Sequence, residues 1–250
     1  MMRVGVITVL PDMFNALNYG VIGRAIEHGK AQVTCWNPRD WSLNEHRQID
    51  DRPYGGGPGM VMMYEPLHGA IMHAKQQLPG CKTIYLSPQG QKVDQAKLNQ
   101  VAENRTPLLL IAGRYEGIDE RIILHDVDEE WSIGDFVLSG GEFAAMVFID
   151  AIIRLLPGSL GHPASAAADS FMHGLLDHPQ YTRPAEVNHA SVPKVLLSGS
   201  HQLIAQWHRK QSLGKTWLKR PDLLANMALN ETDQRLLTEF KLEQKGVKDG

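Results

Sequence analysis

Two patterns of apolar and polar positions alternate over the first 156 residues. Short, continuous apolar runs predict buried strands at Val4–Leu10, Gln32–Trp36, Thr83–Leu86 and Leu108–Ala112. Between them, apolar residues recur at helical spacing, which predicts helices at Gly20–His28, Glu65–Gln77, Asp94–Glu103 and Glu142–Leu156. This alternation of strands and helices indicates an α/β fold with a mostly parallel sheet.

The pattern changes after Pro157 and Gly158. The stretch GSLGHPASAAADSFMHG has neither strand nor helix periodicity and is rich in small residues, so we predict an interdomain linker at residues 159–176. The linker separates an α/β domain, residues 1–158, from residues 177–250. Beyond Pro193 the apolar spacing becomes helical, and Ser198 and Ser200 are candidate caps. A small all-helical C-terminal domain is therefore predicted.

Composition narrows the class of protein. A chain of 250 residues, 43% of them hydrophobic, can bury the core of one large or two modest domains. No apolar run approaches the roughly 18 residues of a membrane helix, and the start lacks a signal-peptide pattern, so a cytoplasmic protein is expected. Cys35 and Cys81 are too few for a disulfide framework or a zinc site, and we interpret both as small buried side chains.

Charge is unevenly distributed along the chain. The net charge of −3 argues against a protein whose whole surface binds nucleic acid. However, residues 187–221 contain no Asp or Glu and carry six cations, Lys194, Arg209, Lys210, Lys215, Lys219 and Arg220. Such a local excess attracts phosphate backbones. Trp207 and Trp217 lie in the same stretch, where packing in a core is the main interpretation and stacking on RNA the alternative.

Three glycine-bearing segments follow strands or occupy loops: YGGGPGM at Tyr54–Met60, GRYEGIDER at Gly113–Arg121 and SIGDFVLSGGE at Ser132–Glu142. Loops at the carboxyl ends of parallel strands are where α/β proteins bind ligands, and glycine lets the backbone approach a ligand closely. None of the segments spells the dinucleotide fingerprint or the phosphate loop of NTPases. For each segment alone, a tight turn is the simpler interpretation.

Several polar side chains are candidates for proton chemistry, namely Arg114, Glu116, Asp119, Asp135, Arg154 and Asp169. An isolated loop acid such as Asp169 is more often simply solvated. Arg154 follows Asp150 by one helical turn, so an ion pair within the helix is the alternative to a role for Arg154 in the chemistry. The eleven histidines show no metal-ligand spacing, and no nucleophile motif is present.

The motifs together resemble a known family. The segments LSPQG, GRYEGIDER, SIGDFVLSGGE, GHPASAAADSF, LDHPQYTRP and QSLGKTWLKRP are similar to those of bacterial tRNA (guanine-N1)-methyltransferases, and the resemblance extends from Val6 to about Phe240. It implies an α/β domain tied in a deep trefoil knot of the SPOUT class, a homodimer, and tRNA as substrate. Knots are so rare that periodicity alone would not predict one.

The resemblance also implies a binding site for S-adenosylmethionine in the knot loops. The implied cofactor residues are Tyr85, Leu86, Ser87, Pro88, Gly113, Tyr115, Glu116, Gly117, Ser132, Ile133, Gly134, Asp135, Phe136, Val137, Leu138, Gly140 and Gly141. Relatives often carry tyrosine at position 136. Phe136 keeps the ring and lacks the hydroxyl. We expect little loss of affinity for S-adenosylmethionine, because backbone atoms make many of the contacts to the cofactor.

The family's catalytic positions fall on Asp169 and Arg154. The implied reaction is methylation of N1 of guanosine 37, which lies 3′ of the anticodon. Asp169 would remove the N1 proton, and Arg154 would stabilise the charge that grows on O6. The resemblance also implies a magnesium ion near Glu116 and Asp169, and base contacts from Gly59 and Ser165. The six cations are the candidate phosphate contacts.

In the family, the linker and C-terminal domain of one subunit reach the cofactor site of the other, so the resemblance implies shared active sites. A linker rich in small residues would become ordered only when tRNA binds. Two other classes of function stay open at this point. A non-catalytic RNA-binding protein would not need Asp169 and Arg154 together. A knotted enzyme acting on ribose 2′-oxygen or ribosomal RNA fits the linker and C-terminal domain less well, and a dehydrogenase lacks its fingerprint.

Overall fold

The computed structural model describes residues 1–161, 166, 169–225 and 227–248, with side chains up to residue 245. The chain divides into two compact units, Met1–Pro163 and Ala164–Gly250, which are described separately below. Their boundary falls within the linker predicted at 159–176. None of the described helices has both the length and the apolar character that crossing a membrane requires.

The first unit is built on a five-stranded parallel sheet in the order β2-β1-β6-β5-β7. The strands are β1 (Met2–Ile7), β2 (Ala31–Trp36), β5 (Lys82–Lys92), β6 (Leu108–Ala112) and β7 (Glu129–Ser132). Four of them were predicted. The edge strand β7 was not, because its sequence EEWS begins with two acids and contains no apolar run. The parallel α/β class is thus confirmed, and the sheet is one strand wider than expected.

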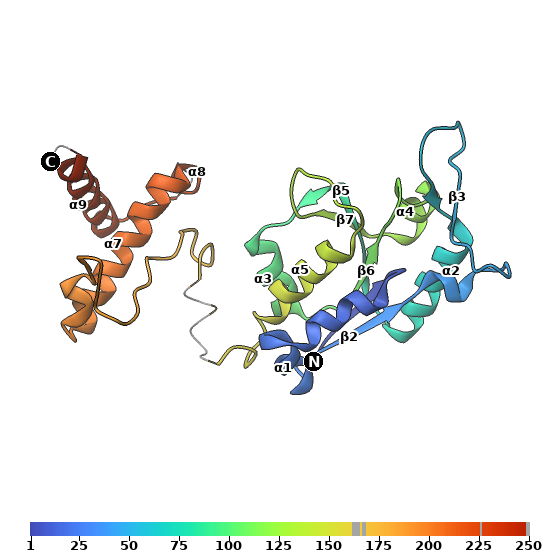
Figure 1. The fold of residues 1–250 in the computed structure, drawn as a ribbon, viewed down its shortest axis with the longest axis horizontal. Helices are drawn as coiled ribbons and strands as arrows, with labels where there is room; N and C mark the ends of the chain where they lie inside the picture. The colour runs from blue at the N-terminus through green and yellow to red at the C-terminus, as the bar shows by residue number, and fades with distance from the viewer. Residues whose placement is uncertain (162–165, 167–168, 226, 249–250) are drawn as a thin grey trace. The chain divides into compact units, whose positions relative to one another are not determined.

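Helices cover both faces of this sheet (Figure 1). On one face lie η1 (Pro11–Asn18), α1 (Gly20–Glu27), α3 (Gln95–Asn104) and α5 (Glu142–Ile153). On the other lie η2 (Pro38–Trp41), α2 (Tyr64–Gln77) and α4 (Glu120–Asp126). Successive side chains of a strand point to opposite faces, so in β6 Leu108 and Leu110 join one core while Leu109 and Ile111 join the other. Burial on both faces explains why the sequence of β6 is a continuous apolar run.

Element ends differ from the predictions where side chains bond to the backbone. The first strand ends at Ile7 rather than Leu10, because Thr8 Oγ1 accepts a hydrogen bond from Leu10 N–H (3.0 Å) and Pro11 starts η1. Asp94 is the N-cap of α3 and accepts from Lys97 N–H at 2.9 Å. The last helix of the unit ends at Ile153, three residues earlier than predicted.

A short hairpin carries the first glycine segment. Its strands β3 (Asp50–Asp51) and β4 (Val61–Met62) pair antiparallel and enclose a loop that contains Gly55, Gly57 and Gly59, all at positive φ. These conformations favour glycine, so the segment is a turn. Met62 N–H donates to Gly117 O (2.9 Å), and this bond fixes the hairpin beside the loop that follows β6.

The second unit is mainly helical, with η3 (Lys194–Leu197), α7 (His201–Lys219), α8 (Pro221–Ala225) and α9 (Glu231–Lys248). Its core contains Leu175, Leu213, Leu236 and Leu237. Of the two predicted caps, Ser200 starts α7 and Ser198 ends η3. The prediction of an all-helical domain is wrong in one respect, since β8 (Glu186–Val187) and β9 (Ala190–Ser191) form a hairpin. Its two turn residues have positive φ, as tight hairpin turns require.

Candidate functional site

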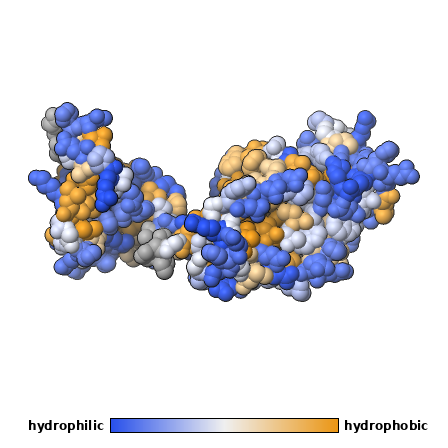
Figure 2. All heavy atoms as spheres, turned by 60° about the horizontal axis from the view of Figure 1, so that its bottom comes forward, coloured by the Kyte–Doolittle hydropathy of each residue, from blue (hydrophilic) through white to orange (hydrophobic). Residues whose placement is uncertain are grey.

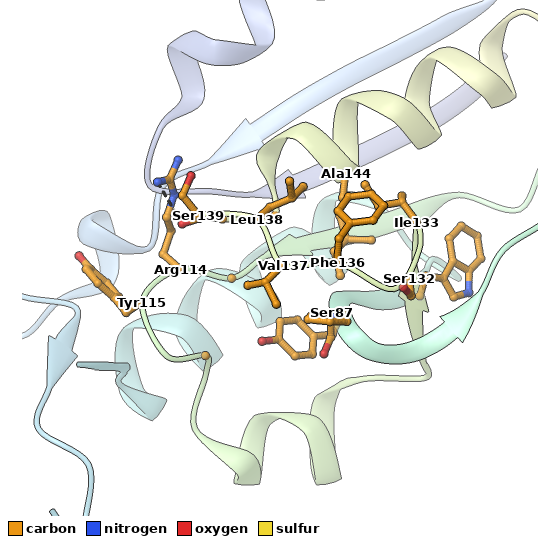
Figure 3. Close-up of a pocket in the computed structure, with 18 of the residues that line it drawn as sticks. Ser87, Arg114, Tyr115, Ser132, Ile133, Phe136, Val137, Leu138, Ser139 and Ala144 are labelled. Atoms are coloured by element: carbon orange, nitrogen blue, oxygen red, sulfur yellow. Dashed lines mark hydrogen bonds between the residues drawn. The ribbon is translucent and has the colours of Figure 1, made fainter. Parts of the chain in front are cut away.

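A cavity of about 210 Å³ opens beside the middle of β5, where its register shifts after Leu86, and beyond the ends of β6 and β7. The segment of β5 and the loops that follow β6 and β7 meet there, at the edge where parallel α/β sheets bind ligands (Figure 3). The lining residues are Tyr85, Leu86, Ser87, Pro88, Gly113, Arg114, Tyr115, Glu116, Gly117, Trp131, Ser132, Ile133, Gly134, Phe136, Val137, Leu138, Ser139, Gly140, Gly141 and Ala144.

Every predicted cofactor residue except Asp135 lines this cavity. The Asp135 carboxylate is largely exposed and accepts a hydrogen bond from Lys92 Nζ at 2.8 Å. Four lining residues were not among the predicted ones: Arg114, Trp131, Ser139 and Ala144. Arg114 and Ser139 lie inside the glycine segments, so their position in the sequence was an available signal, whereas Trp131 belongs to the strand that the apolar pattern missed.

Glycine backbone forms part of the cavity wall. A Cβ atom on Gly141 would lie 2.8 Å from Ala112 Cα, and one on Gly113 would lie 2.9 Å from the Tyr85 ring. Gly141 N–H donates to Gly113 O at 2.9 Å, which holds the two loops backbone to backbone. The close approach leaves no room for a side chain at either position, so these glycines are required by packing and not only by turn geometry.

A buried carboxylate ties the loops to the sheet. The side chain of Glu142 is 1% exposed and accepts hydrogen bonds from Arg114 Nε, at 3.0 and 3.2 Å to its two oxygens, and from Thr8 Oγ1 at 3.0 Å. Arg114 Nη1 also donates to Ser139 O at 3.4 Å. Glu142 starts α5, where a negative charge is stabilised by the helix dipole. The network joins β1, the loop after β6 and the start of α5.

A second network holds the tryptophan of the cavity wall. Trp131 is 2% exposed, and its Nε1–H donates to Glu129 Oε2 at 2.6 Å. Glu129 also pairs with Lys97, at 3.1 Å, and with Lys82. Burial acts to raise the pKa of Glu129, but the hydrogen bonds from Lys82, Trp131 and Lys97 together outweigh it and lower the pKa to about 2. Glu129 is therefore a charged anchor for the indole at neutral pH.

Two tyrosines border the cavity in different ways. Burial, with smaller effects from Glu130 and Glu120, raises the pKa of Tyr85 to about 12, so its phenol stays neutral. Tyr115 is 47% exposed and has φ +61, a conformation that non-glycine residues rarely adopt. Its ring points away from the other labelled side chains in Figure 3. Burial and the neighbouring Asp50 raise the pKa of Tyr115.

The third loop places apolar side chains at the cavity. Phe136 is 54% exposed, Val137 82% and Leu138 40%, which is unusual for three consecutive apolar residues. The ring of Phe136 lies beside Ile133 in Figure 3, and a Cβ on Gly134 would meet that ring at 2.6 Å. Gly134 also has φ +151. The loop thus offers an apolar surface to a ligand in the cavity.

Glu116 joins the cavity to the hairpin loop. Its N–H donates to Met60 O (2.9 Å), and a Cβ on Gly59 would lie 2.4 Å from its carboxylate oxygen Oε1. Gly59, predicted to lie near the substrate base, therefore packs against a predicted cofactor residue. No group of three or more His, Cys, Asp or Glu side chains able to hold a metal occurs among the residues that the structure describes.

The two predicted catalytic residues belong to different units. Arg154 is the half-buried C-cap of α5, and its N–H donates to Asp150 O at 3.1 Å. Asp169 is half-buried in the second unit; its N–H donates to Ala166 O, and its carbonyl accepts from Met172 N–H, both at 3.4 Å. Ser165, a predicted substrate contact, lies outside the described residues.

Ion pairs involve half of the predicted phosphate-binding cations. Arg209 pairs with Asp233 (2.6 Å), Lys210 with Glu243 (2.6 Å) and Arg220 with Asp222 (2.7 Å). The acids follow the acid-free stretch in the sequence, and two of them are on α9, which packs against α7. Over the described part of the chain, no ion pair involves the other three cations, Lys194, Lys215 and Lys219.

The sequence is similar to one protein family and to named bacterial enzymes over nearly its whole length. The family model described as tRNA (Guanine-1)-methyltransferase TrmD matches residues 2–226. A tRNA (guanine-N(1)-)-methyltransferase of Legionella pneumophila strain Philadelphia 1 is 66% identical over 243 residues, 97% of each chain. Proteins of the same name from Pseudoalteromonas translucida and Escherichia coli O127:H6 are 60% and 57% identical, over 96% and 97% of this chain and 94% and 95% of their own. The chain therefore belongs to the tRNA (guanine-N1)-methyltransferase family.

Proposed function

We propose that this enzyme transfers a methyl group from S-adenosylmethionine to N1 of guanosine 37 in tRNA. The observation that carries the proposal is the cavity lined by the middle of β5 and by the loops after β6 and β7, three segments whose motifs are similar to the family's cofactor loops. Its walls suit a cofactor with a purine ring, because glycine backbone at Gly113 and Gly141 offers close approach and the loop at Phe136 offers apolar contact.

The chemistry requires a base and a stabiliser of negative charge. N1 of guanine carries a proton and is a poor nucleophile, so we assign Asp169 as the base that accepts this proton as N1 forms its new bond to carbon. The bound cofactor would supply an electrophilic methyl group on a sulfonium. We assign to Arg154 the stabilisation of the charge that develops on guanine O6, since a planar guanidinium carries several N–H donors that can bind an oxyanion.

We propose a homodimer with shared active sites. Apolar side chains interrupt the mainly polar surface of the first unit (Figure 2). On α5, Phe143 is 55% exposed and Val147 is 51% exposed, one helical turn apart. Exposed apolar surface of this kind marks a protein contact. In a dimer, Asp169 from one subunit would complete the site of the other. The deep trefoil knot of the SPOUT class is part of the same proposal.

For the tRNA surface we propose Lys194, Lys215 and Lys219 as the main phosphate contacts. A cation already paired with a carboxylate must give up that partner to bind phosphate, which favours these three over Arg209, Lys210 and Arg220. We place the enzyme in the cytoplasm with its substrate. Gly59 and Ser165 stay assigned to contacts near the target base.

The test is transfer of a labelled methyl group from S-adenosylmethionine to two tRNA transcripts, one with guanosine and one with adenosine at position 37. We expect label only on the guanosine transcript. The Asp169→Asn variant should bind the cofactor normally and transfer at least about 100-fold more slowly, because general-base catalysis typically contributes that much. Tight tRNA binding without any transfer by the unmodified enzyme would support the non-catalytic alternative instead.

A further inference from the structure

Phe171 has an unusual backbone conformation. Its φ is +72, in the left-handed region that a bulky side chain rarely adopts. Its ring is 42% exposed, so the conformation does not serve to bury the ring in a core. A strained backbone that persists at a half-exposed aromatic residue points to a role in binding.

The surrounding chain holds this conformation in place. Phe171 N–H donates to Leu175 O at 2.7 Å, and Gly174 N–H donates to Phe171 O at 3.2 Å, which closes a tight loop. Leu175 is 5% exposed and belongs to the core of the second unit. The next residue, Leu176, donates its N–H to Thr216 Oγ1 on α7 at 2.9 Å. The loop is therefore fixed to the helical core, and the side chain of Phe171 lies partly exposed on its surface.

A cation lies against the ring. The guanidinium carbon of Arg220 is 5.9 Å from the ring centroid of Phe171, within the range of a cation–π contact. Arg220 is in turn held by two hydrogen bonds to Asp222, at 2.9 and 2.7 Å. The guanidinium, held in place by Asp222, therefore covers part of the ring and limits its movement.

We propose that the ring of Phe171 is a stacking surface for the guanine that the enzyme methylates. Phe171 follows Asp169 by two residues, so the Cα atoms of the two residues lie within about 7 Å of each other, which is comparable to the length of a purine base. A base taken out of its stack exposes both faces, and enzymes receive such bases between aromatic or apolar side chains. The N1 edge then faces the carboxylate while one face of the purine lies on the ring. This inference rests on the proposed function.

Changing Phe171 to Leu removes the aromatic face and retains a Cβ and an apolar side chain. Stacking on an aromatic residue contributes enough that we expect kcat/KM for tRNA to fall about tenfold or more, with KM for S-adenosylmethionine unchanged. Phe171→Tyr should retain most of the activity because it keeps the ring. Tyr181→Leu is the matched control, since Tyr181 is also half-exposed in the second unit and should leave the reaction unchanged.

A fluorescent base separates stacking from a structural role. With 2-aminopurine at position 37 of the tRNA, stacking on Phe171 quenches the emission, so the complex with Phe171→Leu should be brighter than the complexes with the unmodified enzyme and Phe171→Tyr. Equal emission from all three complexes would overturn the inference, as would a loss of activity that parallels a lower melting temperature. If the unmodified enzyme methylates guanosine 37 and Asp169→Asn does not, but Phe171→Leu is fully active, this inference fails while the proposed function stands.

Discussion

Removing the Arg114 guanidinium should leave a buried carboxylate almost unsatisfied. Glu142 has a side chain that is 1% exposed, and its carboxylate accepts hydrogen bonds from Arg114 and from the hydroxyl of Thr8. Breaking a buried ion pair by removing one partner typically costs about 3–5 kcal/mol, because the remaining charge stays out of water. Arg114 itself is 21% exposed, so water reaches part of the site, and for Arg114→Met we expect a loss near the lower end, about 3 kcal/mol.

The measurement is urea-induced unfolding at pH 7, followed by circular dichroism, for Arg114→Met, Glu142→Gln and the double variant. Because the double variant removes both charges, its loss should be smaller than the sum of the two single losses by about 1–3 kcal/mol. Losses that add without any coupling, or a loss below about 1 kcal/mol for Arg114→Met, would refute the interpretation of Glu142 as a charged anchor for the cavity loops.

Three other predictions concern packing, pH and salt. Gly141→Ala places a Cβ against backbone and should lower stability by about 1–3 kcal/mol and weaken cofactor binding by calorimetry, while Gly161→Ala, with nothing within 4 Å, should change neither. The lowered pKa of Glu129 stabilises the fold above its unfolded value of 4.5, so the advantage over Glu129→Gln should shrink as pH falls from 4.5 toward 2; a pH-independent difference in acid unfolding would contradict this. Replacing both Lys215 and Lys219 by Glu should make the plot of the logarithm of the tRNA binding constant against the logarithm of salt concentration shallower by about two units, and should leave cofactor binding unchanged. An unchanged slope would exclude both residues as phosphate contacts.

Much of the fold follows from apolar patterning, and the exceptions have physical causes. The run at Leu108–Ala112 was predicted with its observed bounds because both faces of β6 are buried. The edge strand β7 escaped prediction because Glu129 and Glu130 occupy its first positions. The lysines that bind Glu129, Lys82 and Lys97, lie 47 and 32 residues away. Local periodicity does not report such a contact.

In the site, too, features set by local sequence were predictable and features set by distant contacts were not. The glycine segments after β6 and β7 marked two parts of the cavity wall as candidate ligand loops, because each follows a strand, whereas the set of cofactor residues, with Tyr85–Pro88, was implied by the resemblance to the family. The pair of Arg114 and Glu142, which lie 28 residues apart, depends on how two loops meet, so no spacing rule identifies it. The acid-free stretch likewise predicted six equivalent cations. Folding brings Asp233 and Glu243 of α9 back to two of them, an effect of tertiary structure that a local charge count does not contain.

The glycine wall of the cavity also bears on inhibitor design. A compound that bonds to main-chain N–H and C=O groups near Gly113 and Gly141 contacts atoms that no codon change can replace. Substituting either glycine introduces a Cβ into space already filled by Ala112 or Tyr85. Drug resistance would then have to arise at neighbouring side chains with room to vary, such as the exposed Val137. Ligands that rely on the backbone and avoid that loop should therefore select resistant variants slowly.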